Sequence, residues 1–325
     1  MTDGGLTVLD GTTLRNIELR LPDTNGAVVT GAELLSIAET ATSSSLFGLS
    51  LPEFLKSNAL KRIHIDAVNF SSKEFDREEA SSKFNDYVIA IADELKDDPL
   101  VVSILDGSPL RLFLEDEDDF AMLAENLFTD LDIVDKGKIQ KNEIRNALDH
   151  MGVELGVPPI SEFPSIEDIL KKHGAEGEEE LGQAQFAESL QPVLQDLADA
   201  LSDKNIVIIQ NIKISNGSKL RKLLADEEEL NNVIEKILVT DDAKDRKVCT
   251  KVIRAFLEKN GPMIGLPPLK PNDVMVLLYD QVFAEVDEKT SGDIDRDKCA
   301  ELVKSTLEKF AELLGANPIL HDLDN

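Results

Sequence analysis

The sequence predicts a mostly α-helical protein built from three tandem repeats, each a pair of helix–loop–helix units with short β segments. Three observations predict this class. A similar phrase occurs three times, at Leu9–Arg15, Leu105–Arg111 and Ser215–Arg221. Apolar residues recur at helical spacing after the second phrase. Aromatic residues make up only 5% of the chain, so aliphatic side chains must fill the core, which suits helices.

The repeat is marked by three landmarks in a constant order. The first is the phrase L-D-G-T-T-L-R with its variants L-D-G-S-P-L-R and S-N-G-S-K-L-R. The second landmark is a segment that contains glycine and proline, and it begins at Gly48, Gly156 and Gly265. The third landmark is the start of a late helix, at Lys83, Gln185 and Lys298. Equivalent landmarks lie about 100 residues apart. We therefore expect three domains, at residues 1–98, 99–204 and 205–325.

Each repeat opens with a β-prone run and a glycine turn. The runs are Leu6–Leu9, Leu100–Leu105 and Ile206–Ile214, and the turns contain Gly11, Gly107 and Gly217. Glycine suits a turn residue with positive φ. Acidic clusters follow at Glu115–Asp119 and Asp226–Glu229, where we expect helices to begin. Acids in a first turn complement the helix dipole, so these clusters do not require a cation.

The middle repeat has the clearest helices. Its first apolar face is Phe120, Leu123, Ala124, Leu127, Phe128 and Leu131. The faces of the other three are Ile144, Ala147, Leu148 and Met151, then Ile166, Ile169 and Leu170, then Phe186, Leu190, Val193, Leu194 and Leu197. Four helices separated by two loops are what a pair of helix–loop–helix units requires.

The loop between the first two of these helices, Asp132–Glu143, resembles the calcium-binding EF-hand loop. Asp132 takes position 1, Gly137 position 6, Ile139 position 8 and Glu143 position 12. The two acids supply hard oxygen ligands, and glycine permits the central turn. We expect Ile139 to place a short strand against a partner loop. Val134 and Lys136 occupy positions 3 and 5, where further ligands are expected, so the motif favours the fold more than tight metal binding.

The other loops follow the same frame less closely. In the third repeat, Asp287–Lys298 has Lys289 at position 3 and Lys298 at position 12, so we expect an EF-hand-like loop that is empty at resting calcium. The loop that begins at Asp241 ends at Val252, which removes the bidentate acid, and we expect its Cys249 to be a half-buried thiol. The second loop of the middle repeat is Gly174–Gln185, with Leu181 at position 8. The two loops of the first repeat are Pro22–Glu33, with Val29 at position 8, and Ser72–Lys83.

The candidate ligands for Ca²⁺ come from two loops. They are Asp132, the Lys138 carbonyl, Gln140 and Glu143 in the middle repeat, and Asp287, Ser291, Asp293 and Asp295 in the third. Because neither set is complete, we expect calcium binding to be weak or absent. The fold prediction is a mostly α protein of three tandem EF-hand-like pairs with short β segments.

The segment L-D-G-S-P-L-R-L-F-L-E-D-E-D-D-F, followed by F-T-D-L-D-I-V-D-K-G-K-I-Q-K-N-E-I-R, resembles a plant EF-hand calcium-binding family. That family includes a calcium sensor that binds and restrains SNF-related protein kinases in abscisic-acid signalling. The resemblance is specific around residues 105–150. It implies a calcium-family signalling protein that acts through a protein partner, with a protein kinase as the family's example. The family loop has acidic or amide residues where this chain has Val134 and Lys136.

Charge and composition restrict the partners. The formal net charge is −29, which disfavours nucleic acid and anionic membrane and favours cations and basic protein surfaces. Two cysteines are too few for a disulfide framework, and no apolar run is long enough to span a membrane. The first residues lack the pattern of a signal peptide. We therefore expect a soluble, cytoplasmic protein, with the nucleus as a second location and an undefined oligomeric state.

Two alternatives to calcium regulation are open. The first is a calcium-independent scaffold that keeps the EF-hand fold. The second is an enzyme, because Asp130-Leu-Asp132 and Gly292-Asp293 with Asp297 imitate motifs of haloacid-dehalogenase-type phosphatases. That chemistry needs each motif at the end of a buried strand, whereas residues 120–131 show helical periodicity. We therefore expect a non-enzymatic protein.

Overall fold

The computed structural model describes residues 5–16, 20–21, 28–238, 246–269, 273–288 and 296–322. It is mostly helical (67%) with a small antiparallel sheet, which confirms the predicted mostly α class. The chain forms two compact units: unit 1 is Met1–Ile91 with Val101–Gln210, and unit 2 is Ala92–Leu100 with Asn211–Asn325. The three predicted domain ranges stay a prediction. None of the helices in the described ranges is both long and apolar enough to cross a membrane.

The elements up to the end of the middle repeat are β1 (Leu6–Leu9), α1 (Thr12–Asn16), β2 (Val28–Thr30), α2 (Gly31–Ser45), α3 (Glu53–Arg62), α4 (Ala67–Ser71), β3 (Glu74–Asp76), α5 (Arg77–Asp97), β4 (Leu100–Leu105), α6 (Ser108–Glu115), α7 (Glu117–Leu131), β5 (Ile139–Gln140), η1 (Lys141–Glu143), α8 (Ile144–Met151), η2 (Val153–Leu155), α9 (Ser165–Lys172), β6 (Glu180–Leu181) and α10 (Gln183–Asp203). The later elements are β7 (Ile206–Ser215), α11 (Ser218–Ala225), α12 (Glu227–Leu238), α13 (Arg246–Asn260), η3 (Gly261–Ile264), α14 (Asp273–Glu288), α15 (Arg296–Ala316) and β8 (Ile319–Asp322).

The three predicted β-prone runs are strands β1, β4 and β7 of one sheet, in the order β1-β4-β7-β8. Residues 206–210 of β7 belong to unit 1, and there Gln210 Nε2 donates to Ser103 Oγ at 2.9 Å. Residues 211–215 belong to unit 2, where they pair antiparallel with β8, Lys213 opposite His321. The sequence did not predict β8. This strand is short, and its residues, Ile-Leu-His-Asp, do not alternate between apolar and polar.

The glycine turns after these strands have the predicted positive φ, which is 77° at Gly11, 81° at Gly107 and 74° at Gly217. At Gly107 the backbone also approaches α10, because an added Cβ would lie 2.2 Å from the carbonyl oxygen of Ala198. Only glycine fits there, since a side chain would meet both the strained φ and this contact.

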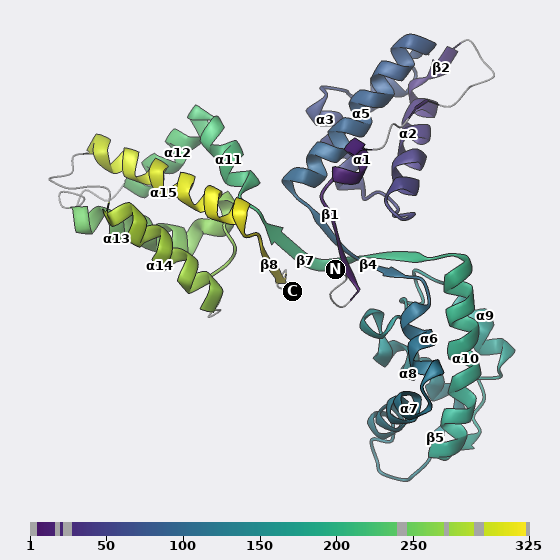
Figure 1. Cartoon of the computed structure of the whole chain (residues 1–325). Coiled ribbons are helices and arrows are strands. Elements are labelled where there is room, and N and C mark those ends of the chain that lie inside the picture. The colour runs from purple at the N-terminus through teal and green to yellow at the C-terminus, as the bar shows by residue number, and fades with distance from the viewer. Residues whose placement is uncertain are drawn as a thin grey trace. The chain divides into compact units, whose positions relative to one another are not determined.

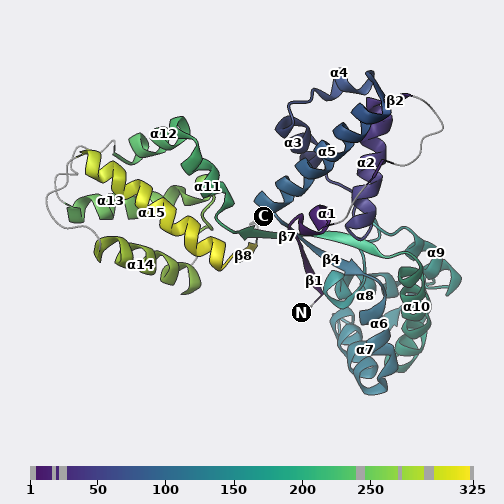
Figure 2. The ribbon, with the colours of Figure 1, turned by 45° about the horizontal axis from the view of Figure 1, so that its top comes forward.

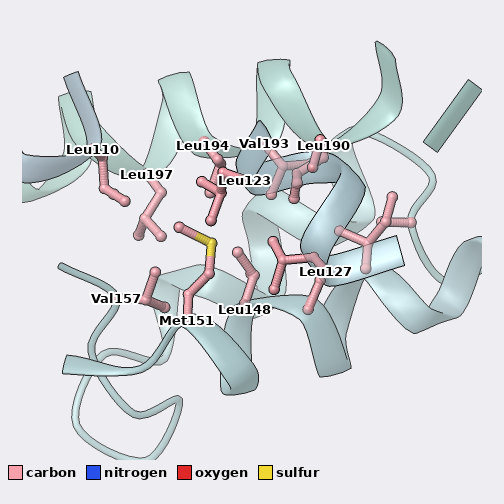
Figure 3. Packing of buried hydrophobic residues seen from close by; sticks show 14 of the residues in the cluster. Leu110, Leu123, Leu127, Leu148, Met151, Val157, Leu190, Val193, Leu194 and Leu197 are labelled. Atoms are coloured by element: carbon pink, nitrogen blue, oxygen red, sulfur yellow. The ribbon is translucent and has the colours of Figure 1, made fainter. Parts of the chain in front are cut away.

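The predicted helical faces of the middle repeat form one core. α7 buries Phe120, Leu123, Ala124, Leu127 and Phe128, and every predicted residue of the α8 and α10 faces is buried. Figure 3 shows Leu123 and Leu127 of α7 pointing toward Leu148 and Met151 of α8, with Leu190, Val193 and Leu194 of α10 on the other side. The acidic clusters begin helices, as predicted, because Asp116 accepts from the amides of Asp118 and Asp119.

The repeat is visible in three helices of equal length. α5, α10 and α15 each contain 21 residues, and each ends three positions before the next strand begins. Gln185 and Lys298 lie in the first turn of α10 and α15, as predicted. Lys83 was wrongly placed, because α5 begins at Arg77 and Glu79 occupies the equivalent position. A shift of four residues keeps the same helix face, so periodicity alone did not expose the error.

Unit 2 has its own core between α11, α12, α13, α14 and α15, which Figures 1 and 2 show side by side. Tyr279 of α14 is 1% exposed and its hydroxyl donates to the Leu257 carbonyl of α13 at 3.0 Å. A disulfide joins Cys249 of α13 to Cys299 of α15, and both residues are 0% exposed. The expectation of a half-buried thiol at Cys249 was therefore wrong.

Candidate functional site

The loop that follows α7 is closed by Asp132. Its amide donates to the Phe128 carbonyl at 2.9 Å, which ends the helix. Its carboxylate then accepts two backbone amides, from Lys136 at Oδ1 (3.0 Å) and from Gly137 at Oδ2 (2.6 Å). Asp135 and Gly137 supply the turn with φ of 51° and 70°. A carboxylate that accepts two amides holds the loop in one shape, since such charge-assisted bonds are strong.

The second half of the loop pairs with its partner loop, as predicted. β5 and β6 are antiparallel, and Ile139 lies opposite Leu181. Both side chains are buried in the core of the middle repeat. The amides of Lys141 and Asn142 donate to the carbonyls of Glu179 and Gly177, which extends the contact.

The other predicted ligands of this loop have separate environments. Lys138 is exposed, and its ammonium lies 3.3 Å from Glu180 of the partner loop, while its carbonyl is the predicted ligand group. Gln140 is exposed. Glu143 ends η1 and accepts from the Asn146 side chain at 2.6 Å. Within the described residues, no three His, Cys, Asp or Glu side chains form a group that could hold a metal ion.

Two positions in the loop carry apolar side chains into solvent. Ile133 is 89% exposed and Val134 is 67% exposed. Val134 stands at position 3, so this position offers no ligand oxygen. Lys136 at position 5 is also exposed and brings a positive charge to the loop. The side chains at both departures from the motif are therefore exposed to solvent.

The predicted sites of the third repeat lie largely outside the described residues. This applies to Ser291, Asp293 and Asp295, to the side chain of Asp287, whose backbone belongs to α14, and to Asp241. In the first repeat, Val29 pairs with Phe75, whereas the frame Ser72–Lys83 would have placed Glu79 at that position. That frame was four residues too late, in agreement with the shifted start of α5. Glu33 caps α2 by accepting from the Thr30 amide at 3.0 Å.

The phosphatase alternative finds no support in the described geometry. Asp130 lies in helix α7, not after a strand, and Asp297 lies in α15. Gly292 and Asp293 are outside the described residues.

Comparisons with known proteins do not extend this picture: no family model matches the sequence, and no curated protein and no solved structure matches it significantly. The resemblance to the plant EF-hand family therefore stays a prediction that depends on the quoted residues.

Besides strand β8, two features were not predicted from the sequence. One is the disulfide of unit 2, whose cysteines are 50 residues apart. Disulfides persist mainly in oxidising compartments, so this bond argues against the predicted cytoplasmic location. That location stays a prediction. The other is a cavity of unit 2 beside the β7–α11 turn, with Lys213 and Lys219 in its lining. The only local signal was a pair of lysines on either side of the S-N-G turn.

Proposed function

We propose that this protein is a non-enzymatic regulatory protein of the EF-hand type, in which loop 132–143 binds calcium weakly and the protein acts through protein partners. The observation that carries the proposal is the shape of the loop. Asp132 accepts the amides of Lys136 and Gly137, and Ile139 is paired with Leu181. The same two features support an EF-hand-like pair in the middle repeat, which is a more specific fold than the mostly α class.

The donor set supports calcium in kind but not in number. Carboxylates of Asp132 and Glu143, the Gln140 amide oxygen and the Lys138 carbonyl are hard oxygen ligands, which calcium prefers. Calcium takes about six to eight such oxygens. Val134 and Lys136 contribute none, and the Lys136 ammonium opposes a cation electrostatically. Weak binding is the expected result, with water completing the coordination.

The surface supports a protein partner. A net charge of −29 favours a basic partner surface and opposes nucleic acid. Ile133 and Val134 offer apolar contact area in the same loop, since they are 89% and 67% exposed. A partner that covers them would also change access to the calcium loop. The resemblance to the plant family adds a protein kinase as the first partner to test.

A calcium-independent scaffold is the second candidate, and one observation favours it. The loop is held by hydrogen bonds of its own, and the Lys138–Glu180 ion pair adds a link between β5 and β6. A loop closed in this way needs no cation to keep its shape. Partners would then dock with and without calcium.

Calorimetric calcium titration of the full chain tests the proposal. We expect weak binding that is lost in Asp132→Ala and in Glu143→Gln. Asp135→Asn is the matched control, because this exposed loop carboxylate is not a predicted ligand and asparagine tolerates its positive φ. Tight binding that survives both ligand changes would overturn the site assignment. No binding at all, with partner capture unchanged by a chelator, would select the scaffold.

A further inference from the structure

The cavity of unit 2 lies where four segments distant in sequence meet. They are the end of α5, the β7–α11 turn, the segment after η3 and strand β8. Its volume is about 270 Å³, which is large enough for a small organic molecule. All of its lining residues belong to unit 2. It is separate from the calcium loop of the middle repeat and does not depend on the proposed function.

Two ammonium groups in this cavity share one carboxylate. Asp98 Oδ2 lies 3.2 Å from Lys213 Nζ and 3.7 Å from Lys219 Nζ. The neighbouring Asp97 is engaged by Lys222 at 2.7 Å. Lys213 and Lys219 therefore share a single carboxylate, and an additional anion would balance the second ammonium group.

The strand register adds a further basic group to the same face. Lys213 lies directly opposite His321 in the β7–β8 ladder, so their side chains point to one side of the sheet. Asp322 is the next residue of β8, and alternation directs its side chain to the other side. Asp322 nevertheless contributes to the lining of the cavity, together with Lys213 and His321.

The stem of Lys219 is held by the backbone of Gly265. An added Cβ at Gly265, which has a φ of 94°, would lie 2.5 Å from Lys219 Cβ. Burial of the ammonium lowers the pKa of Lys219, the charge of Asp98 opposes this, and nearby Lys213 adds to the lowering. An anion beside Lys219 would stabilise its charged form.

Part of the lining is apolar. Pro262, Leu266 and Pro268 contribute to the wall, and Leu266 is 2% exposed. An apolar wall beside a charged group suits a ligand that has both kinds of surface.

We propose that this cavity binds a small organic anion, whose carboxylate or phosphate group pairs with Lys213 and Lys219 and whose apolar body contacts Pro262, Leu266 and Pro268. Carboxylate and phosphate groups both present negatively charged oxygens that can pair with an ammonium group. Benzoate and phenyl phosphate are the probes that distinguish them. The probe that binds more tightly shows whether the ligand carries a carboxylate or a phosphate group.

The test is titration of the isotope-labelled full chain, with the amides of Gly217 and Gly265 as reporters. We expect both probes to shift these amides. Acetate, inorganic phosphate and benzyl alcohol, which each lack one of the two features, should bind more weakly. Lys219→Ala should weaken binding of the probes about tenfold, because it removes a charge-assisted hydrogen bond. Lys304→Ala, an exposed lysine of α15 in the same unit, is the matched control and should leave binding unchanged.

Asp98→Asn should have the opposite effect on the affinity for the probes. It removes the carboxylate that competes for the two ammonium groups, so it should tighten binding of both probes. A purely structural role for this cluster would instead weaken binding in both variants, and that result would overturn the proposal. Failure of both probes to shift the reporter amides of the folded wild-type protein would also overturn it. If inorganic phosphate binds as tightly as phenyl phosphate, the apolar part of the proposal is wrong. Lys213→Ala repeats the test if Lys219→Ala does not fold.

Discussion

Ile139 lies opposite Leu181 in the antiparallel ladder of β5 and β6, and the two side chains are 6% and 4% exposed. This pair is one of several contacts between the two loops of the middle repeat, and it anchors both loops in the core. The buried end of the loop contributes to the core, whereas residues 133–138 at its other end are exposed.

The first prediction concerns this pair. Ile139→Ala should lower the free energy of unfolding by about 2 kcal/mol, because it removes buried methyl groups and leaves a cavity. Ile133→Ala in the same loop is the matched control and should change it by less than about 0.5 kcal/mol, since Ile133 is 89% exposed. Urea unfolding followed by circular dichroism measures both. Equal losses would show that the β5–β6 pair does not anchor the loop.

A second prediction concerns the carboxylate that closes the loop. In calcium-free buffer, Asp132→Ala should accelerate hydrogen exchange at the amides of Lys136 and Gly137, since both lose their acceptor. The same change at Asp130, an exposed residue of α7, should leave these two amides unaffected. Protection that persists in Asp132→Ala would mean that other contacts hold the turn.

The middle repeat could be predicted from the sequence in detail, and the reason is physical. Its four helices each have one clear apolar face, and its two loops keep the same spacing between position 8 and position 12. That spacing aligned Ile139 with Leu181 correctly. In the first repeat the loop residues are less regular, and only helix periodicity was left as a guide. Because residues four apart share a face, Lys83 was aligned where Glu79 belongs.

A third prediction separates two costs at glycine turns. Gly107 and Gly137 both have positive φ, but only Gly107 is in contact with another backbone, where an added Cβ would lie 2.2 Å from the Ala198 oxygen. Gly137→Ala should cost about 1 kcal/mol, the price of the left-handed conformation alone. Gly107→Ala should cost about 3 kcal/mol, since the clash is added. Similar costs in urea unfolding would contradict the close approach of the turn to α10.

A fourth prediction is a pH dependence in the middle repeat. Hydrogen bonds from Lys172, at 2.5 Å, and from His173, at 2.7 Å, lower the pKa of the Asp196 carboxyl below its usual value. A carboxyl with a lowered folded-state pKa stabilises the protein above its unfolded-state pKa and loses this effect as pH falls through the folded-state value. Asp196→Asn should therefore be less stable than the wild type near neutral pH.

This difference should disappear in strong acid, where Asp196 is protonated in both folded and unfolded chains. Thermal unfolding across the acid range measures it. Asp203→Asn, an exposed residue at the end of the same helix, should show no comparable effect. A stability difference that is constant with pH would assign Asp196 a packing role instead.

The unpredicted features share one property: they depend on residues that are distant in sequence. The cavity of unit 2 brings Asp98 beside Lys213 and Lys219, and no local pattern records that Asp98 belongs with residues more than a hundred positions later. The Cys249–Cys299 bond is similar, since neither cysteine lies in a motif that names its partner. Local periodicity determined which faces are buried, whereas long-range packing determined which charged groups meet.

The bond between Cys249 and Cys299 has a consequence for limited proteolysis of unit 2. Every peptide bond between these cysteines lies inside a covalently closed ring, so one cut there leaves both pieces attached through sulfur. The nicked chain would migrate as one band on a gel without reductant and as two bands with it. A cut outside the ring, for example after Lys222, would separate the pieces in denaturant under either condition.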